Sequence, residues 1–376
     1  MFTSKRITIM GGDKFRDEFS LEFDGTNDYI ETPTVFTNAT TYTLGCWIKY
    51  LAEDTYDWLF GTNSSTKSFG LNRAGDQIFY RGDGAGKFYG FGDNSNIPLN
   101  KWTHLVFTSN ATTISCYING NLLSTITVGS TTDLDGSVAL ANTKFTFSRI
   151  NGAYESGGTV SYLVNCKLSD VFAYDSYMTA SQVKTLYNGR EPYNHKEGIV
   201  TANLTHWYRM GDGVHDIKKG SLISDEVDST LGSDLVTEGD FSNGGAAWTA
   251  SGNITTAVNG GAFVSTGDSD GGFGSCAQSK TLTSGNVYLL TFDVTAVTGS
   301  PSVHNYCGQM QTSLGVAKVK TYTNVFLSDG TDGIDIRTIC SNGQGMTINN
   351  IKFQLVNGNA GVMTNMDSVD FVGDTP

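Results

Sequence analysis

Two carboxylates and an amide crowd into a short polar stretch near the start of the chain, Asp24-Gly-Thr-Asn27-Asp28. Oxygen atoms from Asp and Asn side chains and from turn carbonyls are the ligands that Ca²⁺ prefers. The same residue types also form turns without metal, because their side chains hydrogen-bond to nearby backbone groups. Apolar residues flank the stretch, so we expect a strand, a tight turn and a return strand over residues 20–31. The turn therefore predicts either calcium binding or ordinary turn formation.

A second candidate site combines aromatic rings with polar groups between residues 79 and 93. Sugars stack on aromatic faces and hydrogen-bond to amides, carboxylates and cations beside them. The candidate glycan ligands are Tyr80, Arg81, Asp83, Phe88, Tyr89 and Asp93. The alternative is that these aromatic side chains pack the edge of the folded domain, and the sequence leaves both open.

The composition indicates an all-β chain of more than one domain. Its 376 residues include 45 Gly and 5 Pro, and Ser, Thr and Asn are dense throughout, which favours short strands joined by polar turns. The 24 basic and 37 acidic residues give a formal net charge of −13. Such an acidic protein is poorly suited to hold nucleic acid by its phosphates, so we expect no nucleic-acid partner.

The apolar segments of the chain are short. None approaches the roughly 20 apolar residues of a membrane span, so we expect no membrane insertion. The first ten residues lack an apolar core long enough for a signal peptide. We therefore expect the protein to stay in the cytoplasm, or to leave the cell without a signal, as in a virus particle released by lysis.

The six cysteines contain no Cys-x-x-Cys pair, which argues against zinc. We expect free thiols, with one disulfide within residues 276–340 as the alternative.

The elements that would position these residues can be predicted from residue patterns. Residues 42–50 alternate apolar side chains on one face while Trp47 points to the other, which is typical of a strand inside a packed sheet. Residues 102–107 and 114–118 form two further strands, and Asn119-Gly120 suits a type I′ hairpin turn. A single helix is expected after Thr179, with Gln182 completing a capping box.

Several motifs follow one another in a fixed order between about Ser20 and Gly189. They are Leu-Glu-Phe-Asp-Gly, Asp-Tyr-Ile, Tyr-Thr-Leu-Gly-Cys-Trp-Ile-Lys, Trp-Thr-His-Leu-Val-Phe-Thr, Tyr-Ile-Asn-Gly, Lys-Leu-Ser-Asp-Val-Phe-Ala-Tyr and Met-Thr-Ala-Ser-Gln-Val-Lys-Thr-Leu-Tyr-Asn-Gly. In this order the segment resembles a laminin-G-like domain of the concanavalin A-like lectin/glucanase superfamily. The resemblance implies two antiparallel sheets packed as a jelly-roll sandwich, with the helix capping one end.

The resemblance also gives the calcium hypothesis a set of ligands. Domains of this family often hold one calcium near the turn after the first strand and near the last strand. The matching candidates in this chain are Asp24, Asn27, Asp28 and Asp170.

Glucanases on this fold resemble one another in a strand with alternating carboxylates, Glu-x-Asp-x-Glu or a close variant, whose nucleophile and acid lie about 5 Å apart. No such strand is present here. The run Asp225-Glu-Val-Asp228 is interpreted as a solvated charge run, and His104 as a hydrogen-bonded histidine of the core. Neither Gly-x-Ser-x-Gly nor Gly-x-x-x-x-Gly-Lys-Ser/Thr occurs. We therefore predict no catalytic site.

A second module is expected over residues 233–356. Its opening, Asp-Leu-Val-Thr-Glu-Gly-Asp-Phe, and its closing strand, Ile-Asn-Asn-Ile, resemble those of jelly-roll carbohydrate-binding modules. The domain organisation expected from the sequence is an arm at 1–19, a sandwich at 20–190, a connector at 191–232, this inserted jelly roll, and a tail at 357–376. The fold class is all-β, with two antiparallel β-sandwich modules and one short helix.

Two segments that flank the second module complete the prediction. Trp207-Tyr-Arg-Met-Gly-Asp212 and the tail over 361–370 resemble a paired signature of virion proteins from marine tailed phages. We therefore expect a non-catalytic bacteriophage protein on the virion surface, as a head fibre, capsid decoration or tail-fibre component. Its partners would be other virion proteins and cell-surface glycans, in a symmetric homo-oligomer. The alternatives are a carbohydrate-active enzyme or its binding fragment, and a secreted cellular adhesin.

Overall fold

The computed structural model divides the chain into two compact units. The first comprises Met1–Lys218, Ile223–Val227 and Met363–Pro376, and the second comprises Lys219–Leu222 and Asp228–Val362. The residues that the structure describes are 15–36, 39–53, 57–62, 68–72, 77–81, 88–127, 140, 143–148, 163–197, 203–213, 216, 222–227, 230–268, 272–284, 286–307, 310–328, 330, 333–358, 360–366 and 369–376.

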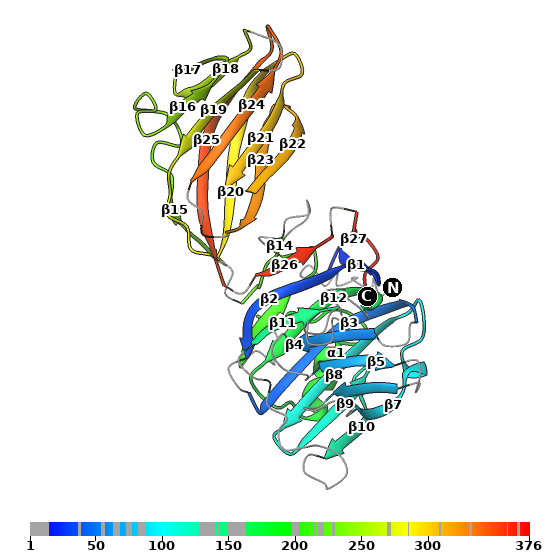
Figure 1. Cartoon of the computed structure of the whole chain (residues 1–376). Coiled ribbons are helices and arrows are strands. Elements are labelled where there is room, and N and C mark those ends of the chain that lie inside the picture. Colours follow the sequence, from blue (N-terminus) through cyan, green and yellow to red (C-terminus); the bar gives the residue numbers. More distant parts are fainter. Residues whose placement is uncertain are drawn as a thin grey trace, which may run out of the picture. The chain divides into compact units, whose positions relative to one another are not determined.

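Two eight-stranded sheets form the first unit (Figure 1). Sheet A has the order β10 (Asn121–Thr127), β9 (Thr113–Ile118), β8 (Trp102–Asn110), β3 (Thr41–Ala52), β12 (Asn165–Tyr174), β1 (Ser20–Asp24) and β27 (Phe371–Val372), and β13 (Leu204–Tyr208) also pairs with β12. Sheet B has the order β14 (Leu222–Ile223), β26 (Gly361–Thr364), β2 (Tyr29–Phe36), β11 (Thr143–Phe147), β4 (Asp57–Thr62), β5 (Ser68–Asn72), β6 (Gln77–Arg81) and β7 (Phe88–Asp93). A short 3₁₀ helix, Asn94–Asn96, follows β7.

The main core lies between these sheets. Leu44, Cys46 and Ile48 of β3 point into it, as the strand alternation predicts, and they join aromatic residues from both sheets. Trp47, between them, points to the outer face of sheet A. All six cysteines are buried free thiols, which confirms the expectation from the sequence.

The single helix α1 (Ala180–Tyr187) covers part of the outer face of sheet A. Its predicted capping box is present: Gln182 N donates to Thr179 Oγ1, and the Gln182 side chain accepts from Thr179 N. Val183 and Leu186 are buried in a second apolar cluster with Phe172 of β12. These two residues and Tyr187 face the sheet, because the i, i+3, i+4 spacing gives the helix one apolar side.

The expected type I′ turn is also present. Asn119 and Gly120 both have positive φ, 50° and 75°, as this turn requires. A Cβ on Gly120 would lie 3.0 Å from Tyr187 Cβ. The turn therefore packs directly against the end of α1.

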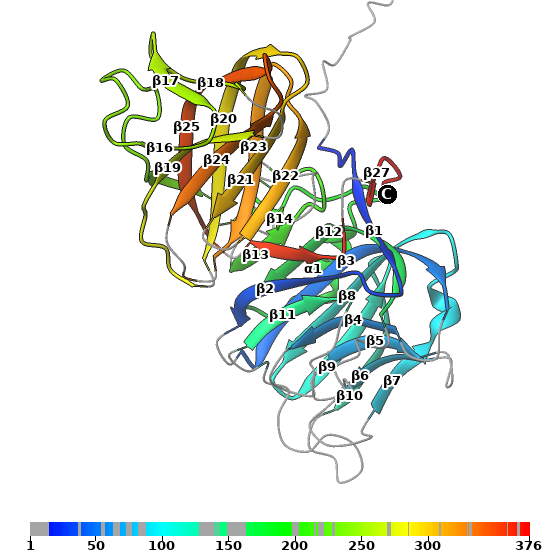
Figure 2. The ribbon, with the colours of Figure 1, turned by 45° about the horizontal axis from the view of Figure 1, so that its top comes forward.

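Two further sheets form the second unit (Figure 2). Sheet C has the order β17 (Thr255–Asn259), β18 (Ala262–Thr266), β25 (Gly345–Asn357), β20 (Val287–Thr298) and β23 (Lys320–Leu327), with β15 (Thr230–Asp234) beside β25. Sheet D has the order β16 (Thr249–Gly252), β19 (Gly272–Gln278), β24 (Ile334–Cys340), β21 (Ser302–Cys307) and β22 (Met310–Val316). Trp248 joins the core of this unit.

The predicted connector at 191–232 contributes a strand to sheet A. Residues 204–208 form β13, which pairs with β12. Asp225 is fully buried, accepts the backbone N–H of Trp207 at 3.0 Å and lies 2.6 Å from Nδ1 of His206. The interpretation of Asp225-Glu-Val-Asp228 as a solvated charge run is therefore wrong for Asp225 and Glu226, because the fold packs this segment against β13.

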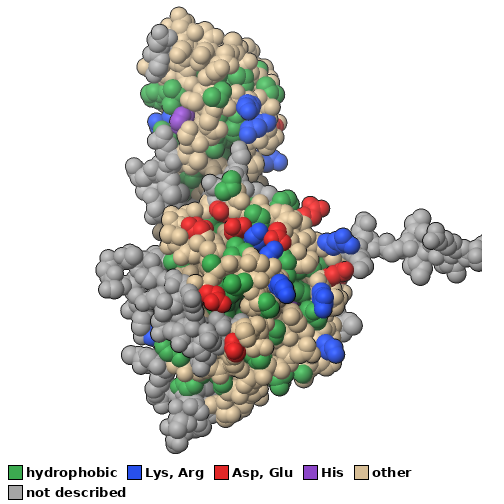
Figure 3. Space-filling model, turned by 90° about the vertical axis from the view of Figure 1, so that its right-hand side faces the viewer, with side chains coloured by type: hydrophobic (Ala, Val, Ile, Leu, Met, Phe, Trp, Pro, Cys, Tyr) green, Lys and Arg blue, Asp and Glu red, His purple; other side chains and the backbone are tan. Residues whose placement is uncertain are grey.

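The charged groups on one face of the first unit are mixed in sign (Figure 3).

Within the described part of the chain, no helix is long and apolar enough to cross a membrane.

Candidate functional site

The opening turn holds three of the four predicted calcium ligands close together. Asp24 Oδ1 accepts the backbone N–H groups of Thr26 and Asn27 at 2.6 and 3.1 Å. Asp28 Oδ2 accepts the backbone N–H of Asp24 at 3.0 Å. Burial raises the pKa of Asp28 to about 6, and the neighbouring carboxylates of Asp24 and Asp370 act in the same direction. The turn therefore stabilises itself, while its carboxylates repel one another.

The structure separates Asp170 from this turn. Asp24 lies opposite Asn165 in the β1–β12 register, so Asp170 lies five residues further along β12, about 17 Å away at the usual strand rise. Its carboxylate accepts Trp207 Nε1 at 2.6 Å and lies 3.4 Å from His195 Nε2. The predicted four-residue site is therefore wrong in Asp170, because a β-bulge after Ser169 turns this residue toward β13. Within the described parts of the chain, no three His, Cys, Asp or Glu side chains are grouped to hold a metal ion.

The predicted glycan residues on β6 and β7 are mostly interior. Tyr80 is buried in the main core, and Arg81 is 2% exposed. The Arg81 guanidinium lies 5.7 Å from the Trp58 ring centroid and 5.5 Å from that of Phe88. These contacts match the alternative in which the aromatic residues pack the sandwich.

The remaining predicted residues do not complete a site. Tyr89 is also buried, and Asp93 is exposed, where its Oδ1 accepts the Ser95 backbone N–H at 2.7 Å. Asp83 lies outside the described residues. The structure therefore does not bring the six predicted residues together on one open surface.

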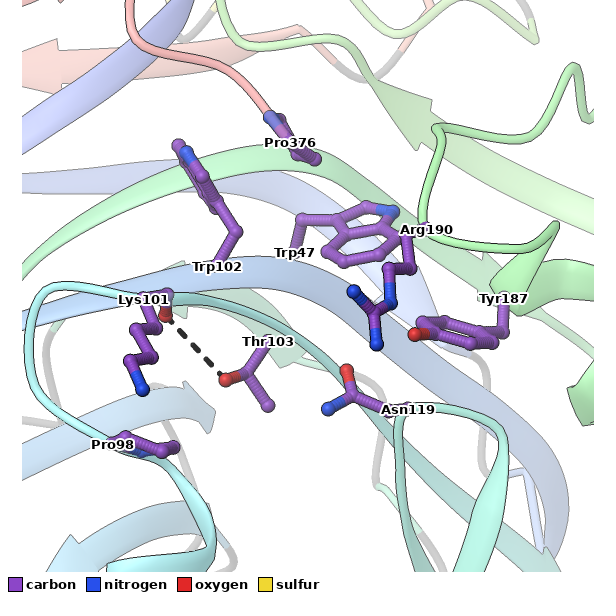
Figure 4. Close-up of a pocket in the computed structure, with 9 residues that line it drawn as sticks. All are labelled: Trp47, Pro98, Lys101, Trp102, Thr103, Asn119, Tyr187, Arg190 and Pro376. Atoms are coloured by element: carbon purple, nitrogen blue, oxygen red, sulfur yellow. Dashed lines mark hydrogen bonds between the residues drawn. The ribbon is translucent and has the colours of Figure 1, made fainter.

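A pocket of about 450 Å³ opens instead on the outer face of sheet A, beside α1 (Figure 4). Nine residues line it: Trp47, Pro98, Lys101, Trp102, Thr103, Asn119, Tyr187, Arg190 and Pro376. Figure 4 shows Trp47, Arg190 and Tyr187 gathered on one side and Trp102 on the other, with Thr103 and Asn119 below the two tryptophans in this view. All nine belong to the first unit.

Strand register places the two tryptophans. Trp47 lies opposite His104, and Lys49 lies opposite Trp102, in the β3–β8 pairing. Residues two apart on one strand share a face, so Trp47 and Trp102 occupy neighbouring positions on the outer face of sheet A. Tyr187 reaches this face from the last turn of α1, and its ring centroid lies 5.7 Å from that of Trp47.

His104 forms the floor beneath this aromatic group. Its ring lies 5.1 Å from Trp47 and 5.9 Å from Tyr187. Burial lowers the pKa of His104 to about 3, so the ring is neutral. Among the described residues neither ring nitrogen has a hydrogen-bond partner. The prediction of a buried histidine is confirmed, but its expected hydrogen bond is absent because its neighbours are aromatic rings.

Asp374 fixes one wall of the pocket. Its carboxylate accepts Trp102 Nε1 at 3.1 Å and binds Lys49 and Lys167 at 2.8 and 2.9 Å. Hydrogen bonds from Lys49, Lys167 and Trp102 outweigh partial burial and lower the pKa of Asp374 to about 2. The orientation of Trp102 therefore depends on a carboxylate more than 270 residues away in the chain.

The second unit presents another aromatic and charged surface on sheet D. The Arg337 guanidinium lies 3.9 Å from the Tyr306 ring centroid and 5.3 Å from that of Phe273. Arg337 Nε also donates to Asp335 Oδ2 at 2.6 Å. A cavity of about 330 Å³ lies beside Tyr306, Asp335 and Arg337. The partly exposed rings and the ion pair share the outer face of this sheet.

Sequence reasoning missed the pocket in the first unit. Residue alternation predicts that Trp47 points away from the core and that Trp102 lies in a strand, but their common face depends on the β3–β8 register. Arg190 and Tyr187 join them only because α1 folds back on sheet A. One sequence signal could have indicated this pocket. Trp47 and Trp102 are two tryptophans on strands that the sequence predicts within one sandwich, and both can face outward.

The double-sheet sandwich of the first unit, with its aromatic pocket, has the architecture of a lectin-like domain. Residues 24–184 match the family model of the concanavalin A-like lectin/glucanases superfamily. Residues 24–184 are therefore a domain of that superfamily, as the motifs in this segment predicted. No curated protein matches the sequence of the chain.

Solved structures show weaker likeness. A Bacteroides ovatus protein proposed to bind carbohydrate is 17% identical over 57% of this chain, with a TM-score of 0.42. This match spans 56% of that protein. The heptameric pentraxin of Limulus polyphemus is 16% identical over 49% of this chain and 85% of its own, with a TM-score of 0.37. A family 4 carbohydrate-binding module is 15% identical over 31% of this chain and 99% of its own, with a TM-score of 0.27. These values are too low to transfer a ligand to this chain.

Proposed function

We propose that this protein is a non-catalytic carbohydrate-binding protein whose first unit binds a glycan in the pocket between Trp47, Trp102 and Tyr187. The single observation that carries the proposal is this arrangement of three aromatic rings around a cavity of about 450 Å³ with amide, hydroxyl and cationic groups at its wall. Aromatic faces bind the C–H surfaces of sugar rings, while polar groups at the edge fix the hydroxyls.

The side chains at the pocket favour binding over hydrolysis. A glycosidase needs two carboxyl groups about 5–9.5 Å apart on either side of the scissile bond. Of the described side chains that line the pocket, none carries a carboxylate. The neighbouring Asp374 is engaged by two lysines and an indole.

A glycan array followed by calorimetry tests this function. Trp102→Ala should weaken binding by about tenfold, since an aromatic contact contributes about 0.5–1.5 kcal/mol beyond its buried area. Tyr177→Ala is the matched control, because Tyr177 is 38% exposed and lies outside the pocket. Loss of binding in both variants, or in neither, would contradict a site at the pocket.

The surface around Arg337, Tyr306 and Phe273 is the corresponding candidate in the second unit. There the Arg337 guanidinium covers two aromatic rings and is paired with Asp335, and Tyr306, Asp335 and Arg337 line a cavity. We expect Tyr306→Ala to weaken glycan binding without changing binding in the first unit. Calorimetry of the Trp102→Ala protein, in which only this second surface remains intact, measures that contribution.

The finer proposal is a role on the virion surface of a tailed bacteriophage, as a head fibre, capsid decoration or tail-fibre component. Its support is the sequence signature formed by Trp207–Asp212 and residues 361–370, which contribute to β13 of sheet A and β26 of sheet B. In this role the protein would form a symmetric homo-oligomer with other virion proteins around it. Antibody labelling of intact particles tests the location, and labelling absent from every particle would contradict it.

Two other functions remain as alternatives. A carbohydrate-active enzyme would release sugar from a polysaccharide and would lose turnover when one carboxylate pair is substituted. A secreted cellular adhesin would be found outside intact cells by fractionation. Either outcome would replace the virion proposal.

A further inference from the structure

We propose that the pocket selects glycans that carry a negative charge, either a carboxylate or a sulfate on the sugar. This inference rests on the proposed glycan-binding function and concerns the chemical class of the ligand.

The pocket is cationic although the protein is acidic. The chain has a formal net charge of −13, yet Lys101 and Arg190 line the pocket and no described lining side chain carries a carboxylate. Both cations are exposed, and neither forms an ion pair with a described residue. These two cations outnumber the one carboxylate of the lining residues, the main-chain carboxylate of Pro376, and a concave site with excess positive charge attracts an anionic ligand.

The neighbouring negative charge is already neutralised. Asp374 lies beside Trp102 and binds the ammonium groups of Lys49 and Lys167 at 2.8 and 2.9 Å. Its charge is therefore shared between two lysines on the sheet. Lys101 and Arg190 remain available for a ligand.

The two cations lie on different walls. Figure 4 shows Arg190 beside Trp47 and Tyr187, and Lys101 beside Pro98 on the other side of the pocket. A sugar ring stacked on Tyr187 or Trp102, which are partly exposed, would present a substituent to Arg190. The planar guanidinium suits a carboxylate or a sulfate, because it can donate two parallel hydrogen bonds to either group.

The buried Trp47 indole supports a ligand at this wall. Trp47 is 2% exposed, and its Nε1 has no acceptor among the described residues. A buried donor without an acceptor is unfavourable in the free protein. An acceptor group on a ligand that enters between Trp47 and Arg190 would remove this cost after a small side-chain shift.

Three matched trisaccharides test the proposal by calorimetry: neutral galactotriose, the same sugar with one galacturonate, and the same sugar with one 6-O-sulfate. At 50 mM salt we expect at least one acidic form to bind about five- to tenfold more tightly than the neutral form. The two acidic arms distinguish a carboxylate ligand from a sulfate ligand. The advantage should decrease at 300 mM salt, because the charges at the pocket are exposed.

Charge variants locate the effect. Arg190→Gln and Lys101→Gln should each weaken binding of the acidic sugar by about threefold to tenfold and weaken neutral binding clearly less. Arg190→Lys should retain part of the preference, since it keeps the charge and loses the planar fork. Lys318→Gln is the matched control, because Lys318 is an exposed lysine of the second unit.

The outcomes separate this inference from the proposed function. Neutral and acidic sugars could bind equally well, with Trp102→Ala weakening the binding of both. This result would overturn the selection for charge and leave the proposed glycan-binding function intact. A preference for acidic sugars that survives the Arg190→Gln/Lys101→Gln double variant would also overturn it. Binding of none of the three sugars, together with an empty glycan array, would remove the proposed function and this inference with it.

Discussion

Arg209 Nη2 lies 2.8 Å from Oδ1 of Asp17, and the Arg209 guanidinium also covers the ring of Phe15 at 4.6 Å. The first described residues of the chain are thereby attached to the segment that follows β13. Asp17 Oδ2 in addition accepts the Ser169 hydroxyl at 2.9 Å. A buried carboxylate therefore joins three segments that are far apart in the sequence.

This relationship predicts a dependence of stability on pH. Burial and the neighbouring Asp170 raise the pKa of Asp17 to about 7, against the opposing effect of Arg209 and Ser169. Between about pH 4 and pH 7 the folded state thus binds a proton that the unfolded chain has released. The stabilisation is complete below pH 4 and is lost as the pH rises through 7. Urea denaturation from pH 5 to pH 8 should show a fall in the free energy of unfolding of at most about 1.4 kcal/mol per pH unit from this group.

The Asp17→Asn variant isolates this group. Its free energy of unfolding should change less with pH than that of the native protein over the same range. Asp175→Asn is the control, because Asp175 is exposed. Identical pH profiles for native protein and Asp17→Asn would contradict the prediction.

Asp374 should stabilise both the fold and the pocket. Asp374→Asn should lower the free energy of unfolding by about 1 kcal/mol, because the ion pairs with Lys49 and Lys167 are partly exposed. Its pKa is lowered to about 2, so its contribution is complete above the ordinary aspartate pKa and fades only as the pH falls toward 2. The difference between native protein and variant should therefore stay constant from pH 5 to pH 8. A difference that appears only above pH 7 would point to another group.

The turn at Gly120 should tolerate no side chain. Gly120→Ala should destabilise the protein by about 1–2 kcal/mol, since φ is +75° and the new Cβ would lie 3.0 Å from Tyr187 Cβ. Gly343→Ala is a useful comparison, because its φ is +77° but no atom lies within 4 Å of the added Cβ. Thermal denaturation should show a larger loss at Gly120, with the difference due to contact with α1. Equal losses would mean that the backbone conformation alone sets the cost.

Calcium at the opening turn remains a prediction, now confined to Asp24, Asn27 and Asp28. An ion there would relieve the repulsion that the Asp28 carboxylate experiences from Asp24 and Asp370. We expect calcium to raise the melting temperature of the native protein and chelation with EDTA to reverse the change. Asp24→Ala should abolish the response, whereas Asp170→Asn should leave it intact. A melting temperature that is the same with calcium and with EDTA would leave an ordinary turn.

The sequence by itself determined the local structure and the family. Alternation along residues 42–50 predicted a strand with Trp47 turned outward, and Thr179 with Gln182 predicted the start of α1. Asn119 and Gly120 predicted their own turn, because both residues tolerate positive φ. These features depend on neighbours within a few residues, so residue patterns are sufficient to find them.

Only the tertiary structure decided which outward-facing residues meet. Side chains alternate along a strand, so the sequence predicts that Tyr80 and Arg81 point to opposite faces of β6. It does not predict that both side chains are buried by other parts of the fold. Asp170 left the predicted calcium site because β12 changes its partner from β1 to β13 at a bulge. The pocket joins Trp47, Trp102 and Arg190 through the β3–β8 register and the packing of α1. Such pairings are set by contacts between distant segments, and a single sequence contains no local signal for them.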